Sequence, residues 1–91
     1  MVDWRQIEPL AKRANVDPYI IYETLESIEQ GVSFSLAFAE ACENQNLYGD
    51  YQEAIEHRVR AAEHLDHVHG VSISRYDAVN IDDVLFHERK N

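Results

Sequence analysis

Apolar residues recur at helical spacing along most of the chain, which predicts a protein built mainly of helices. In the first such segment Asp3 can act as the N-cap, and Gln6 follows three residues later in a capping-box pattern. Pro9 lies inside this segment, so an alternative start of the helix lies near Glu8, with Pro9 as the first helical residue. We expect the helix to end at Asn15.

A second helix is expected to open at Asp17–Pro18, because a capping carboxylate followed by proline is typical of a helix start. Gly31 is well placed to end this helix. Residues 32–38 alternate between apolar and small polar side chains, which is a strand period. The Ala- and Glu-rich composition that follows favours a helix, and we expect one from about Phe34 to Gln45.

Residues 50–69 are expected to form the longest amphipathic helix, with Asp50 as its cap and Gly70 as its stop. Its expected apolar face consists of Ala54, Ile55, Val59, Ala61, Ala62, Leu65 and Val68. Asn80 can cap a last helix, which would dock through Val84, Leu85 and Phe86. The chain therefore predicts a single small all-α domain over residues 1–91, a compact bundle of four to five helices.

Residues 10–32, LAKRANVDPYIIYETLESIEQGV, resemble the helix-turn-helix of winged-helix and related bacterial transcription regulators. Ala11 is small where the two helices would pack closest, and Val16 would fill the turn. Ile21 and Leu25 would face the first helix from the second. The resemblance implies a DNA-binding regulator, acting as a dimer, whose second helix enters the major groove.

The charge of the chain opposes that implication. The sequence has 17 acidic and 8 basic residues and a formal net charge of −9, and such a field repels phosphate and attracts basic protein surfaces. The second helix carries Glu23, Glu26 and Glu29 and no Lys or Arg. A helix that reads DNA needs cationic or neutral donors toward the phosphates, so a protein partner is favoured over DNA.

Two tyrosines, Tyr19 and Tyr22, lie one turn apart beside these glutamates, and tyrosine is favoured at protein interfaces. The leading hypothesis is an acidic regulator or inhibitor that occludes a basic partner protein, such as one that handles nucleic acid. Small antitoxins, immunity proteins and phage-encoded inhibitors share this general profile of size and charge. In the DNA-binding alternative, the phosphate backbone would be held by basic residues of the first helix: Arg5, Lys12 and Arg13.

The long helix carries a polar stripe composed of Glu53, His57, Arg60, His64 and His67, spaced by four, three, four and three residues. Histidines one and two turns apart can share a metal ion, so a metal-binding bundle that uses the three histidines is a third alternative. Because the stripe points away from the expected apolar face, a solvated polar surface is favoured over a metal site. Protonation of a partner-binding stripe below about pH 6.5 would alter binding.

Cys42 is the only cysteine, which excludes an internal disulfide and suits a reducing compartment. Its neighbours do not activate a thiol, so we expect it to act as a small buried hydrophobe. Glycine-rich phosphate loops and apolar pockets around a carboxylate are not evident, and neither an enzyme nor a cofactor is expected. The sequence pattern also lacks a signal peptide and a membrane span, which favours a cytoplasmic protein. A homodimer is a further possible state of the chain.

Overall fold

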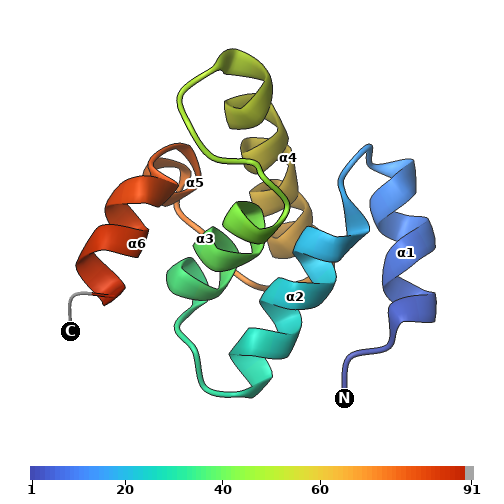
Figure 1. The fold of residues 1–91 in the computed structure, drawn as a ribbon. Helices are drawn as coiled ribbons and strands as arrows, with labels where there is room; N and C mark the ends of the chain where they lie inside the picture. The colour runs from blue at the N-terminus through green and yellow to red at the C-terminus, as the bar shows by residue number, and fades with distance from the viewer. Residues whose placement is uncertain (90–91) are drawn as a thin grey trace.

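The computed structural model describes residues 1–89, which form α-helices joined by short loops (Figure 1). The helices are α1 (Trp4–Arg13), α2 (Pro18–Glu29), α3 (Phe34–Asn44), α4 (Gln52–His69), α5 (Arg75–Val79) and α6 (Ile81–Arg89). The all-α prediction is confirmed. The expected count of four to five helices is wrong, because the short α5 was not anticipated.

Local capping explains where α1 and α2 begin. The Asp3 carboxylate accepts a hydrogen bond from the Arg5 backbone N–H at 3.0 Å, so α1 starts at Trp4 and the alternative start near Glu8 is wrong. Pro9 therefore lies inside the helix. The Asp17 carboxylate caps α2 in the same way, accepting from the Tyr19 N–H at 2.9 Å.

The turn between α1 and α2 depends on one residue in the left-handed conformation. Asn15 has φ +58°, a region that asparagine tolerates better than most side chains. The next residue, Val16, is buried, and its N–H donates to the Ala11 carbonyl at 2.9 Å. Ala11 is itself buried, so the two helices approach closely beside this turn.

The ambiguous segment is helical: α3 covers Phe34–Asn44, as the Ala-rich composition indicated. Its buried face consists of Ala37, Phe38, Ala39, Ala41 and Cys42. Small side chains on this face allow α2 and α3 to pack closely together. The alternating pattern of residues 32–38 does not produce a strand, and the N-terminal Phe34 is left partly exposed.

The long helix α4 starts later than expected, with Tyr51 rather than Asp50 at its N-cap position. It ends at Gly70, which has φ +68° and donates its N–H to the Asp66 carbonyl at 3.1 Å. Val68 was expected on the apolar face, and this is wrong because its side chain is 45% exposed. Arg58, which is not among the residues of the expected apolar face, is buried on this helix.

The C-terminal part contains the unexpected short helix α5, which Ser74 caps by accepting from the Asp77 N–H at 3.1 Å. Asn80 separates α5 from α6. Val84 and Leu85 of α6 are buried, as expected. Phe86 is 63% exposed, so its expected docking on the body is wrong.

Figure 1 shows α2 between α1 and α3, and α2 packs against both as well as against α4. At the other side of the molecule α6 packs against α3. One hydrophobic core joins all six helices and includes Ile7, Ile20, Ile21, Phe38, Leu65, Ala78 and Ile81. Among residues 1–89, none of the helices has the combination of length and apolar character needed to cross a bilayer.

Candidate protein-binding surface on α1 and α2

The packing of α2 decides which of its side chains reach solvent. Ile20, Ile21 and Thr24 are buried, and the Thr24 hydroxyl donates to the Ile20 carbonyl at 2.7 Å within the helix. The predicted protein-binding residues lie outside this buried face. Tyr19 is 54% exposed, Glu26 and Glu29 are exposed, and Tyr22 and Glu23 are half-buried.

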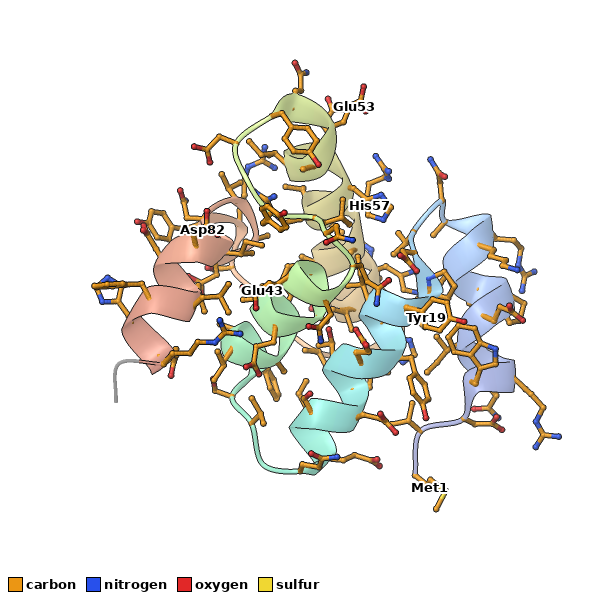
Figure 2. All side chains as sticks on the ribbon, in the orientation of Figure 1. Met1, Tyr19, Glu43, Glu53, His57 and Asp82 are labelled. Carbon is orange, nitrogen blue, oxygen red and sulfur yellow. The ribbon has the colours of Figure 1, made fainter. Side chains whose placement is uncertain are left out.

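An aromatic cluster joins α1 to α2 and consists of Trp4, Tyr19 and Tyr22. The ring centroids of Trp4 and Tyr19 lie 4.7 Å apart in a tilted arrangement, and those of Trp4 and Tyr22 lie 5.7 Å apart edge to face. Figure 2 shows Tyr19 in the space between the two helices. The two tyrosines are therefore held in place by Trp4. Sequence reasoning missed Trp4, although its spacing within α1 placed it on the side that faces α2.

The acidic stripe, defined as Glu23, Glu26 and Glu29, follows the same helix. The Tyr22 hydroxyl donates to the Glu26 carboxylate at 2.9 Å, and this bond is the main reason why the pKa of Tyr22 is raised. The side-chain amide of Gln45 donates to Glu23 at 3.2 Å. Glu29 pairs with the amino group of Met1 at 3.1 Å. Among the described residues, Glu23 and Glu26 thus have neutral hydrogen-bond partners and no ion pair.

The basic residues proposed for the DNA-binding alternative all lie on α1, and all are exposed. Arg5 pairs with Asp3 at 3.5 Å, and Lys12 pairs with Glu8 at 3.1 Å. Arg13 donates to the carbonyl one turn earlier in its own helix. Two of these three cations are thus paired with carboxylates of the same helix, which weakens the positive field they could offer to a phosphate.

The histidine stripe of α4 is not the solvated surface that its spacing predicted, and that expectation is wrong for His57. The Asp17 backbone N–H donates to Nε2 of His57 at 3.1 Å, across 40 residues of sequence. Three residues along α4, Arg60 donates to the Asn15 carbonyl at 3.2 Å. Figure 2 shows His57 on the side of α4 that faces the turn. Together the two side chains fasten the turn between α1 and α2 to α4. Burial lowers the pKa of His57.

The expectation of a solvated stripe is also wrong for His64, which is only 8% exposed. Its ring lies edge to face against His69, with centroids 5.8 Å apart, and burial lowers the pKa of both histidines. His67 is exposed, as expected. Within residues 1–89, no three His, Cys, Asp or Glu side chains are grouped closely enough to hold a metal ion. His57, His64 and His67 are therefore not brought together as metal ligands.

Arg58 is 1% exposed and has a role that sequence reasoning missed. Its guanidinium donates to the carbonyls of Ala78 at 2.8 Å, Val79 at 2.7 Å and Leu47 at 3.1 Å. Two of these carbonyls belong to the last turn of α5, where helical carbonyls have no partner within the helix. A cation at this helix end is also favoured by the helix dipole. Arg58 thus holds α5 and the loop before α4 on the body of the protein.

Cys42 is buried on α3, as expected. Burial raises the pKa of its thiol to about 12, against a smaller opposing effect of the Arg58 charge. The thiol is therefore protonated at neutral pH and enclosed by the core. It is a packing group and offers no nucleophile at the surface.

The chain was compared with protein-family models, with curated proteins and with solved structures, and no match was found. The resemblance to a helix-turn-helix rests on residues 10–32 alone. Any proposal about function therefore depends on the geometry and charge described above.

Proposed function

We propose that the protein binds a basic surface of a partner protein through the acidic stripe and the aromatic cluster. The formal charge of −9 gives the whole molecule a field that attracts such a partner. One of the eight cationic side chains, Arg58, is enclosed and bonded to backbone carbonyls. The solvent-facing surface therefore carries even less positive charge than the composition suggests.

The observation that carries the proposal is the juxtaposition of ordered aromatic rings with carboxylates that lack a cationic partner. The Tyr22 hydroxyl holds the Glu26 carboxylate, and the Tyr22 ring lies edge to face against Trp4, which also contacts Tyr19. A Lys or Arg side chain is attracted both to the face of an aromatic ring and to a carboxylate. Preformed rings also reduce the entropy that binding must offset.

The mechanism that follows is occlusion. A protein that handles nucleic acid carries Lys and Arg where phosphates bind, and a row of carboxylates on a helix can occupy the same positions. Glu23 and Glu26 lie one turn apart, so both can meet cations of one surface. Association of this kind is steered by charge and is expected to weaken steeply as salt is added.

The experiment uses two double variants with the same change in charge. Glu23→Lys with Glu26→Lys alters the acidic stripe, whereas Glu53→Lys with Glu56→Lys alters two exposed residues of α4 at the same spacing. Figure 2 shows Glu53 at the far end of α4, away from Tyr19. Each pair moves the formal charge from −9 to −5. Trp4, the single tryptophan, is a fluorescent reporter within the aromatic cluster.

The probe is an Arg- and Lys-rich peptide of about 16 residues, titrated at low and at physiological salt. We expect wild type and the α4 variant to bind with similar affinity and to change Trp4 fluorescence. The stripe variant should bind at least tenfold more weakly. Equal weakening in both variants would show that only net charge matters and would overturn the proposed surface.

Duplex DNA provides the complementary titration. We expect no binding at low salt, where even non-specific regulators bind. Binding that is lost when Arg5, Lys12 and Arg13 are changed to Ala would instead favour the DNA-binding alternative.

A further inference from the structure

An apolar groove with a volume of about 550 Å³ runs between α1, α2 and the C-terminal end of α4. Its apolar lining includes Leu10 of α1, Leu25 and Ile28 of α2, and Val68 and Val71 at the end of α4. The groove lies beside the acidic stripe and shares Glu29 with it.

The groove leaves two aliphatic side chains open to solvent. Leu10 is 38% exposed and Val68 is 45% exposed, although Val68 was expected on the apolar face of its helix. Exposed aliphatic groups on facing walls of one groove are typical of a surface that receives apolar side chains of another molecule.

The charge at the rim of the groove indicates the charge of the molecule that it would bind. Asp3 and Glu29 both line it, and Glu29 is also a member of the acidic stripe. Carboxylates at the rim favour a cationic occupant.

We propose that this groove receives the apolar face of a basic amphipathic helix, with the Lys and Arg side chains of that helix directed at the rim carboxylates and the acidic stripe. This inference rests on the proposed function, since it specifies how the basic partner is held. Helices bind grooves through apolar residues at positions i, i+3 or i+4, and i+7, which leaves the flanking positions for charge. A second copy of this chain fits less well, because two chains of formal charge −9 repel each other.

The test compares two synthetic peptides of the same composition. The first has Leu at i, i+3, i+4 and i+7 of an 18-residue Lys-rich helix, and the second has the same residues in a scrambled order that destroys the apolar face. Binding is measured by calorimetry and located by backbone amide NMR shifts. We expect the amphipathic peptide to bind at least tenfold more tightly and to shift residues around Leu10, Ile28, Val68 and Val71.

The variant Val68→Asp makes the test specific, because it removes apolar surface from the groove while adding an attractive negative charge. We expect this variant to bind the amphipathic peptide at least tenfold more weakly than wild type does. Phe34→Asp adds the same charge at an exposed aromatic residue outside the groove and should leave the affinity within about twofold. Leu10→Ser is the second groove variant, for use if Val68→Asp does not fold, and should weaken binding in the same direction.

Three results of the peptide experiments would each overturn the inference. They are equal affinity for the two peptides, a Val68→Asp variant that binds like Phe34→Asp, or NMR shifts confined to other surfaces. Sedimentation that shows a dimer abolished by Val68→Asp would assign the groove to a second copy and would also overturn it. If the groove variants have no effect while the Glu23 and Glu26 substitutions still weaken basic peptides, the groove is wrong and the proposed function stands. Failure of the groove proposal can therefore be distinguished from failure of the proposed function.

Discussion

Replacing Arg58 with Met is expected to destabilise the protein more than any surface change. Methionine keeps much of the aliphatic stem but removes the three N–H groups that reach Ala78, Val79 and Leu47. The two α5 carbonyls would then lie at a helix end without their donor. The five-residue α5 is too short to persist on its own, so its position depends on tertiary contacts such as this one.

The magnitude follows from the three bonds. A hydrogen bond from a charged donor contributes about 1.5–3 kcal/mol, and part of this is recovered because the charge no longer has to be desolvated. We therefore expect a loss of about 3–4 kcal/mol in the free energy of unfolding. A domain of this size has a total free energy of unfolding of about 5–15 kcal/mol, so the variant should be only marginally stable. Its Tm should fall by roughly 15 °C or more.

Urea unfolding followed by circular dichroism at 222 nm measures this loss, and Arg75→Met, at an exposed arginine of α5, is the matched control. Arg58→Lys should be intermediate, since one ammonium cannot span three carbonyls. Amide hydrogen exchange should show lost protection in α5 and α6 before the rest of the molecule. A loss below about 1 kcal/mol in Arg58→Met, with an unchanged m-value, would refute the capping role.

Four further outcomes are expected. The thiol of Cys42, whose pKa burial raises to about 12, should react with a disulfide reagent only on unfolding, and rapid reaction of the native protein would contradict its enclosure. Because burial lowers the pKa of His57 and His64 in the folded state, the unfolded chain takes up protons first as pH falls through about 6.5. The free energy of unfolding should therefore decrease between pH 7.5 and 5.5, and His57→Gln and His64→Gln should each reduce that dependence. Asn15→Val should cost about 1–2 kcal/mol in urea unfolding because of its φ of +58°, whereas Asn15→Gly should cost little. Stoichiometric zinc should leave the Tm unchanged, because His57, His64 and His67 are not grouped, and a clear rise would contradict this reading.

The sequence predicted those features that depend on neighbours in the chain. Asp3 and Asp17 cap their helices, and Gly70 ends α4, because each signal acts within one turn of helix. The composition of α3 outweighed a misleading strand period, since its small residues pack against α2. The candidate residues of α2 were likewise found to lie outside the buried face, because helical periodicity fixes which positions share a side.

The sequence did not reveal contacts between distant segments. Arg58 and His57 occupy helix positions where a charged or polar side chain is normally solvated. Their partners lie 11 to 40 residues away in the chain, at Leu47, in α5 and at Asp17, and no local signal identifies them. The short α5 was missed for the same reason, because it is held by a side chain of α4.

These contacts bear on how the helix-turn-helix-like segment can be used. His57 and Arg60 fasten its turn to α4, and α2 packs against α3 along its other side. The helix that resembles a recognition helix therefore presents a limited exposed stripe, and the side chains on that stripe are tyrosines and glutamates. A duplex would meet carboxylates first, at a cost that grows as water is excluded. A basic protein surface would meet the same groups with attraction, which is why we propose a protein partner rather than DNA.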